Sequence, residues 1–323
     1  MQMRRLGQTG LKVAPLCLGG NPFGWTVDEA QSFAVLDAYA EGGGNFIDTA
    51  DAYSMWVPGN SGGESEAILG SWLKSRGNRR AMVVGTKVYS PMGKGPNDRG
   101  LSRQHIMQAV EDSLRRLQTD YIDLYMSHYD DPETPLEETL RAYDDLVRQG
   151  KVRYIGASNH SAWRLTRALW VSDKQGWVRY ESLQPRYNLV DREPYERDLE
   201  AACQEQGLGV ITYYGLASGF LSGKYRKGAP LPKSGRAAAV ERGYMNDRGF
   251  AILDQVERAA LAHSATPAQV ALAWVLARPS ITAPIASATT PEQVRDLLGA
   301  AEVTLSAESL AALDAASTWR AAA

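Results

Sequence analysis

Short apolar segments alternate along the chain with longer segments in which apolar residues recur at helical spacing. The short segments predict strands, because a brief continuous apolar run is typical of a strand that is buried on both faces. The longer segments predict amphipathic helices. We expect eight strands, at residues 16–18, 46–48, 82–87, 122–126, 152–158, 182–184, 209–213 and 281–286.

Helices are expected between these strands and after the last one. Several of their ends carry residues that helix termini favour, namely serine or proline at the start and glycine just past the end. The predicted helices are 27–41, 64–74, 102–117, 135–149, 161–173, 195–206, 247–277 (broken near Thr266-Pro267) and 291–298, with a short helix after 306. The end signals are Ser102 and Ser306 as N-caps, Pro135 and Pro291 as first helical residues, and Gly150 and Gly207 as terminating glycines.

Eight strands that alternate with eight helices make the count of a (β/α)8, or TIM, barrel, which is an α/β fold. Residues 4–13 precede the first strand and predict an added N-terminal β-hairpin that plugs the N-terminal face of the barrel. Extra helices are expected at the C-terminal end. No linker or low-complexity tract interrupts the pattern, so residues 1–323 are predicted to form a single domain.

A doubly wound parallel sheet is the main alternative fold. A dinucleotide-binding sheet of that kind should carry a G-x-G-x-x-G fingerprint after its first strand. Here Gly42-Gly43-Gly44 comes before a predicted strand, and Gly207-x-Gly209 leads into Thr212. The fingerprint is missing, which favours the barrel.

The composition is 44% hydrophobic and 22% charged, and 37 acidic residues balance 35 Lys and Arg for a net charge of −2. A protein that binds nucleic acid without sequence preference normally has a strong basic excess. The two cysteines, Cys17 and Cys203, form no disulfide framework, which is typical of the reducing cytosol. We find no signal-peptide pattern and no apolar run long enough to span a bilayer. We therefore expect a cytoplasmic protein with no nucleic-acid or membrane partner; its oligomeric state is left open.

In a (β/α)8 barrel, active-site residues lie at the C-terminal ends of the strands. The second predicted strand ends at Asp48 and is followed by Tyr53, the third ends at Lys87, and the fourth is followed by His128. Later strand ends add a further polar set: Ser158 and Asn159, then Gln184, then Tyr213.

The first four residues share a chemical purpose. A tyrosine phenol has an ordinary pKa of about 10 and donates a proton poorly at neutral pH. We expect the Lys87 ammonium to lower the pKa of Tyr53 towards neutrality, which takes roughly 3–4 kcal/mol. Asp48 would keep Lys87 charged, and His128 would orient the substrate oxygen through a hydrogen bond. Such a site delivers a proton to an oxygen that gains negative charge, as carbonyl reduction requires.

Each residue alone has a simpler interpretation. Asp48 could cap a turn, and Tyr53 and His128 could be packing residues. Lys87 could be an exposed strand end or the Schiff-base lysine of a barrel lyase. Their occurrence at successive strand ends favours the catalytic interpretation. No metal is predicted, because His105, His160 and His263 lack the spacing of metal ligands.

Longer sequence blocks then resemble a known family. These blocks are 45–53 (NFIDTADAY) with Gly63-Glu64-Ser65-Glu66, 124–128 with 151–159, and 219–225. Together they are similar to the motifs of the aldo-keto reductase superfamily, in its bacterial type, over nearly the whole chain. The resemblance implies a (β/α)8 barrel that binds NADP(H) without a Rossmann fold and reduces an aldehyde or ketone to an alcohol.

The resemblance also implies roles for individual residues. Tyr53 would be the acid/base, Lys87 its partner, Asp48 the third member of the relay, and His128 the residue that orients the carbonyl. Ser158, Asn159 and Gln184 would hold the nicotinamide carboxamide, and Tyr213 would stack on the ring. The other implied cofactor contacts are Gly20, Asn21, Asp48, Leu216, Ala217, Ser218, Gly219, Lys224, Arg236, Ser287, Thr289, Gln293 and Asp296.

A basic segment supports a dinucleotide independently of the resemblance. Residues 216–248 carry seven Lys and Arg against Glu241 and Asp247, and we expect a long loop that clamps a pyrophosphate. The alternative is a solvated surface loop.

The chain departs from many relatives at Tyr214-Gly215, where they have Ser-Pro, at Thr289, where some have a cation for the 2′-phosphate, and at Leu297, which replaces an asparagine. NADP(H) is therefore expected with a weakened preference, and NAD(H) stays open.

The mouth of the barrel is expected to be lined by Trp25, Trp56, Tyr89 and Tyr129, with Met245 as a further candidate. An aromatic, mostly neutral pocket suits a neutral carbonyl compound of moderate size. Lys94 and Arg99 are the candidates for contacting an anionic substrate.

Two other functions stay open. One is a non-catalytic or slow, cofactor-sensing regulatory protein of the same fold. The other is a lyase that forms a Schiff base on Lys87. Borohydride trapping on Lys87 would favour the lyase, and consumption of NADPH with an aldehyde would favour the reductase.

Overall fold

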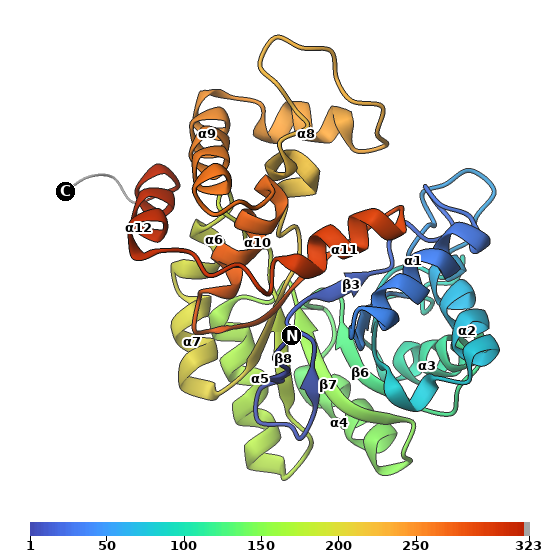
Figure 1. Cartoon of the computed structure of the whole chain (residues 1–323). Coiled ribbons are helices and arrows are strands. Elements are labelled where there is room, and N and C mark those ends of the chain that lie inside the picture. Colours follow the sequence, from blue (N-terminus) through green and yellow to red (C-terminus); the bar gives the residue numbers. More distant parts are fainter. Residues whose placement is uncertain (320–323) are drawn as a thin grey trace.

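Eight parallel strands close into a barrel in the computed structural model, which describes residues 1–319 (Figure 1). Around the barrel the order is β10-β3-β4-β5-β6-β7-β8-β9, so each strand pairs with its neighbour in the chain and the last strand pairs with the first. The strands are β3 (Cys17–Gly19), β4 (Phe46–Asp48), β5 (Val83–Val88), β6 (Ile122–Ser127), β7 (Val152–Ser158), β8 (Tyr180–Gln184), β9 (Gly209–Thr212) and β10 (Ile281–Ala286). The eight predicted strands and the (β/α)8 class are confirmed.

Helices surround the barrel and bury one face against it. They are α1 (Glu29–Glu41), α2 (Glu64–Arg76), α3 (Arg103–Leu117), α4 (Leu136–Arg148), α5 (Ala162–Gln175), α6 (Glu193–Glu196), α7 (Leu199–Gln206), α8 (Ala237–Tyr244), α9 (Asp247–Ala262), α10 (Pro267–Leu276), α11 (Pro291–Gly299) and α12 (Ala307–Ala316), with 3-10 turns at Arg79–Ala81 and Ala217–Ser222. Ser102 and Ser306 are N-caps whose side chains accept from backbone amides, as predicted. The break at Thr266-Pro267 is also confirmed, with Thr266 as the N-cap of α10 and Pro267 as its first residue.

Three local predictions are wrong. The helix predicted at 195–206 is split into α6 and α7, which are separated at Arg197-Asp198. Pro135 is the N-cap of α4 rather than its first residue, whereas Pro291 does begin α11. Residues 216–248 are not one long loop, because a 3-10 turn and α8 form within them; the apolar Ala237, Val240 and Tyr244 of α8 are buried.

The N-terminal hairpin closes the end of the barrel at which the strands begin. Its strands, β1 (Arg4–Arg5) and β2 (Lys12–Val13), pair antiparallel, and Leu6 and Val13 join the apolar cluster inside the barrel. Gly7 has a positive φ of 53°, and a Cβ there would lie 2.4 Å from the backbone oxygen of Glu181. The predicted plug is therefore confirmed, and Figure 1 shows it at the opposite end from α8.

Within residues 1–319, no single helix has the length and apolar character needed to cross a membrane. The pair α9 and α10 passes that test by length and composition only when taken together, with a 96° bend between the helices.

Candidate active site

Asp48, Lys87 and Tyr53 form a hydrogen-bonded group at the C-terminal end of the barrel. The Lys87 ammonium donates to the Asp48 carboxylate at 2.7 Å and to the backbone oxygen of Thr49 at 2.8 Å. It also lies 2.9 Å from the Tyr53 hydroxyl, which donates to Asp48 over 3.2 Å. Lys87 is fully buried and Asp48 is 2% exposed, so water does not screen the pair.

Strand register brings these residues together. β4 and β5 are neighbours, with Asp48 opposite Gly85, and Lys87 lies two residues further along on the same face of β5. Because side chains alternate along a strand, Lys87 points into the barrel while Thr86 points outward. The outward hydroxyl of Thr86 donates to Glu66 of α2 at 2.5 Å.

The pKa of Tyr53 is raised well above its ordinary value, first by burial and then by the neighbouring Asp48 carboxylate. The expected net lowering of the Tyr53 pKa is therefore wrong. One ammonium does not outweigh desolvation of the phenolate plus a carboxylate in hydrogen-bond contact. Tyr53 is consequently a neutral phenol at physiological pH, with its proton in place.

His128 follows β6 and stands beside Tyr53, with the ring centroids 6.1 Å apart. Burial, together with the charge of Lys87, lowers the pKa of His128 to about 3. The imidazole is thus neutral at pH 7. Its Nδ1 is buried and has no hydrogen-bond partner among residues 1–319.

The polar residues at later strand ends form one network with this group. Gln184 donates to Asp48 Oδ1 at 2.8 Å, and Ser158 donates to the backbone oxygen of Gln184 at 2.9 Å. Asn159 donates to the backbone oxygen of His128 at 2.9 Å and accepts from the Tyr213 hydroxyl at 2.7 Å. The strand ends thus hold amide and hydroxyl groups close to Asp48.

A cleft of about 840 Å³ opens above this network. The predicted residues on its wall are Asn21, Trp25, Asp48, Tyr53, Trp56, His128, Tyr129, Ser158, Asn159, Gln184, Tyr213, Leu216, Ser218, Gly219, Lys224, Arg236, Ser287, Thr289, Gln293 and Asp296. Gly20 and Ala217 were expected as cofactor contacts, but both are buried and do not line the cleft. Their chain neighbours Gly19 and Ser218 do line it. A Cβ on Gly20 would lie 2.9 Å from Ser65 Oγ, so that glycine permits close packing.

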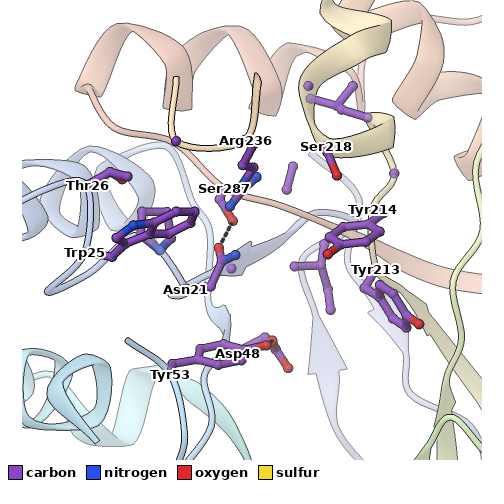
Figure 2. Close-up of a pocket in the computed structure, with 18 of the residues that line it drawn as sticks. Asn21, Trp25, Thr26, Asp48, Tyr53, Tyr213, Tyr214, Ser218, Arg236 and Ser287 are labelled. Carbon is purple, nitrogen blue, oxygen red and sulfur yellow. Dashed lines mark hydrogen bonds between the residues drawn. The ribbon is translucent and has the colours of Figure 1, made fainter. Parts of the chain in front are cut away.

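Positive charge without acidic partners lines one side of the cleft. Lys224, Lys233 and Arg236 face it, and none of them forms an ion pair within the described residues. Burial lowers the pKa of Arg236; burial and the charge of Arg236 lower the pKa of Lys224. Figure 2 shows Arg236 reaching down into the cleft opposite Tyr53 and Asp48.

The other cations of the expected clamp turn away from the cleft. Arg226 pairs with Glu257 and Lys227 pairs with Asp247. Arg248 donates to the backbone oxygens of Val190 and Ser317. These three residues and Arg242 do not line the cleft.

Aromatic rings form the outer wall. Trp25 and Trp56 make an edge-to-face pair with centroids 5.4 Å apart, and Trp56 also meets the Tyr53 ring at 6.2 Å. Tyr129 stacks on His128. The expectation for Tyr89 is wrong, because it packs behind Tyr129 and against the core. Met245 likewise packs against the core, and Lys94 and Arg99 do not reach the cleft.

The segment after β10 closes the far end of the cleft. Ser287 donates to Asn21 Oδ1 at 2.8 Å, a contact drawn in Figure 2. Gln293 Oε1 accepts from the backbone and hydroxyl of Thr289, and Asp296 accepts from Thr266.

Within residues 1–319, no group of three or more His, Cys, Asp or Glu side chains could hold a metal ion.

A model described as the Aldo/keto reductase family matches residues 15–318. The chain belongs to the aldo/keto reductase family. As a member it is an oxidoreductase, of a family that generally uses nicotinamide cofactors.

Several curated relatives of this aldo/keto reductase match over almost their full length. It is 40% identical over 320 residues to "Uncharacterized oxidoreductase YrpG" of Bacillus subtilis, covering 97% of this chain and 95% of the relative. It is 35% identical over 312 residues to "Probable voltage-gated potassium channel subunit beta" of Arabidopsis thaliana, covering 94% and 92%. It is 34% identical over 340 residues to "Versiconal hemiacetal acetate reductase" of Aspergillus parasiticus, covering 97% and 96%.

The sequence reasoning missed some residues that line the cleft of this aldo/keto reductase. Arg186 lies two residues after Gln184 and places its guanidinium 5.1 Å from the Tyr214 ring. Both residues follow strand ends, so that signal could have found them. The position of Gly235 on the cleft wall could not be predicted from sequence. It depends on the close approach of Gly235 to Trp25, where a Cβ would lie 2.9 Å from the ring, and only the folded chain creates that approach.

Proposed function

We propose that this aldo/keto reductase reduces an aldehyde or ketone to an alcohol, with NADPH as the preferred cofactor. The observation that carries the proposal is the buried Lys87 ammonium 2.9 Å from the Tyr53 hydroxyl, at the floor of a cleft with unpaired cations on its other side. The first feature moves a proton, and the second binds a polyanion.

Tyr53 is the proton donor in this proposal. Its raised pKa keeps the phenol protonated until a carbonyl oxygen gains negative charge against it. As the proton leaves, the phenolate forms next to the Lys87 ammonium, which stabilises it through a charge-assisted hydrogen bond. Asp48 holds that ammonium charged and in place. When bound, the reduced nicotinamide supplies the hydride for the carbonyl carbon.

Neutral His128 and the aromatic wall orient the substrate. A neutral imidazole donates one hydrogen bond to a carbonyl oxygen without competing as an acid. Trp56 packs against the Tyr53 ring and Trp25 packs against Trp56, so both rings are placed to contact a substrate bound beside Tyr53. The rings of Trp25, Trp56 and Tyr129 give this side of the cleft an aromatic surface, which favours a neutral substrate.

The residues present fit a nicotinamide dinucleotide. A volume of about 840 Å³ suits a ligand of this size, since ligand clefts span roughly 300–1,000 Å³. Lys224 and Arg236 face the cleft without anionic partners, which suits a pyrophosphate. Of the non-glycine residues with positive φ, most lie in the loops around the cleft: Ser54, Asn159, Tyr214, Ala217 and Ser218. Such strain gathers at ligand sites.

The preference for NADPH rests on few cations. The α11 side of the cleft offers Thr289, Gln293 and Asp296, and Arg295 of that helix pairs with Glu292 instead of facing the cleft. With Lys224 and Arg236 assigned to the pyrophosphate, Lys233 is the cleft-facing cation of residues 216–248 that is left for a 2′-phosphate. NADH is therefore a weaker but competent cofactor in this proposal.

The lyase alternative has little geometric support. All the hydrogen atoms on the Lys87 ammonium are engaged, by Asp48, Thr49 and Tyr53, and its side chain is fully buried. A Schiff-base lysine needs an accessible, deprotonated amine. The regulatory alternative is retained as an outcome of the test, since some relatives are named as channel subunits.

The test is a fluorescence titration with NADPH and NADH, followed by assays on a panel of aldehydes and ketones. We expect tighter binding of NADPH and turnover of neutral aromatic or alicyclic carbonyls. Binding of NADPH without turnover of any carbonyl would instead support a cofactor-sensing role. Tyr53→Phe is the matched control, because it removes the proton while preserving the ring.

A further inference from the structure

The loop between Asp48 and Tyr53 holds a carboxyl group that the proposed reaction does not use. Asp51 is fully buried, and neither of its carboxyl oxygens has a well-aligned hydrogen bond within residues 1–319, although the backbone amides of Ala52 and Tyr89 act on the carboxyl group. A buried carboxylate with no partner is strongly disfavoured, so such a group keeps its proton.

The surroundings of Asp51 make a second negative charge costly. Glu66 of α2 is equally buried, and its carboxylate accepts from Thr86 and, at 2.7 Å, from Arg116 of α3. Arg116 is thus already engaged by Glu66. Burial, and next the charge of Glu66, raise the pKa of Asp51 to about 8, against the smaller lowering effects of Arg116 and nearby backbone amides.

Two further groups face this cluster. Tyr125 of β6 and Tyr143 of α4 are buried nearby, and both keep their hydroxyl protons because burial raises their pKa well above the ordinary value. The Tyr125 hydroxyl also lacks a hydrogen-bond partner in the described part of the chain. Asp51 and Glu66 are therefore the acidic groups whose charges can meet here, and Arg116 is the cation that acts on Asp51.

The backbone of Asp51 ties the Tyr53 loop to the strand that carries Lys87. The Asp51 amide donates to the backbone oxygen of Lys87 at 3.2 Å. Two residues earlier, the Thr49 amide donates to Gly85 of the same strand at 2.8 Å, and the Thr49 oxygen accepts from the Lys87 ammonium. The loop is thus fastened to β5 at two points just before Tyr53.

We infer that Asp51 is a positioning residue that holds Tyr53 against Lys87, and that it does so only while its carboxyl group is protonated. Ionisation would place two buried carboxylates beside one arginine. Their repulsion would push the loop away from α2 and β5 and would lengthen the contact between the Tyr53 hydroxyl and the Lys87 ammonium. The inference rests on the proposed function for its effect on turnover, but not for its effect on the loop.

The first test is the pH dependence of kcat for reduction of 4-nitrobenzaldehyde with NADPH. The pKa of His128 is lowered to about 3 and that of Tyr53 is raised well above its ordinary value, so both shifts move these groups away from pH 8. We expect kcat of the wild type to fall about tenfold per pH unit above pH 8, with unchanged NADPH affinity. Asp51→Asn, which mimics the protonated acid, should remove that limb. Asp173→Asn, an exposed carboxyl group on α5, should keep it.

The second test needs no turnover. Hydrogen–deuterium exchange of residues 49–56, corrected for the intrinsic effect of pH, should show protection that falls in the wild type with a midpoint near pH 8. Protection in Asp51→Asn should stay constant. If that variant does not fold, the wild-type midpoint decides.

Unchanged wild-type protection up to pH 9.5, or the same alkaline limb in Asp51→Asn, would overturn the inference. An enzyme that reduces no carbonyl but shows the expected exchange would refute the proposed function while supporting the role of Asp51.

Discussion

Replacing Lys87 by methionine tests the charge at the centre of the proposed site. The Lys87 ammonium is fully buried and contacts Asp48, Thr49 and Tyr53 within 2.7–2.9 Å. Methionine fills a similar volume without the charge. The change leaves the Asp48 carboxylate buried, with Gln184 at 2.8 Å and Tyr53 at 3.2 Å as its remaining side-chain donors.

Both stability and turnover should fall, for separable reasons. Removing one partner of a buried ion pair costs about 3–5 kcal/mol, because the other charge stays buried without compensation. Loss of the ammonium also removes the group that stabilises the Tyr53 phenolate. We expect kcat to fall by roughly 10²–10⁴-fold, as is typical when acid–base catalysis is impaired. That range corresponds to about 3–5 kcal/mol of activation free energy.

A double variant separates the two effects. Lys87→Met with Asp48→Asn removes both charges, so its free energy of unfolding in urea should recover much of the loss, while turnover stays low. Unfolding can be followed by tryptophan fluorescence and chemistry by single-turnover oxidation of NADPH. The reasoning is refuted if Lys87→Met keeps more than about a tenth of wild-type kcat, or if the double variant is no more stable than the single one.

Further predictions concern the proton donor, the cofactor, the imidazole and the barrel floor. Tyr53→Phe should abolish turnover and leave the Kd for NADPH nearly unchanged; rates close to wild type would remove Tyr53 from the acid role. Arg236→Gln should raise the Kd for NADPH by about tenfold or more through loss of a charge-assisted contact, and unchanged titrations would place the pyrophosphate elsewhere. The native pKa of His128, about 3, lies below its ordinary value, so its neutral form stabilises the fold at pH 7 and this contribution is lost as pH falls from 6.5 towards 3. His128→Asn should flatten that part of the stability–pH curve, and an unaltered curve from thermal unfolding would contradict the burial argument. Gly7→Ala should lower the free energy of unfolding by about 1–3 kcal/mol or more, because it adds a strained backbone to a clash with Glu181; a neutral result would contradict the close approach of Gly7 to Glu181.

The alternation of short apolar runs with amphipathic stretches was enough to predict the barrel. Its strands are buried on both faces, so each reads as a brief apolar run, and the helices between them carry one apolar face. The rule that strand ends carry the chemistry then located Asp48, Lys87 and His128, because parallel strands all end at the same rim. Caps such as Ser102 and Ser306 could be read from sequence because their hydrogen bonds are local.

Features that depend on contacts between distant segments could not be read in this way. Tyr89 follows a strand end just as Tyr129 does, yet packing places one behind the other. The pKa of Tyr53 is governed by burial, which the spacing of residues in the sequence does not reveal. The direction of its shift was therefore predicted wrongly. Some cations of residues 216–248 turn away from the cleft because they pair with residues elsewhere in the chain, as Arg226 does with Glu257. Sequence determines which groups stand at the rim of the barrel, because that depends on local periodicity; tertiary structure decides their burial, charge and partners, because those depend on what other segments bring against them.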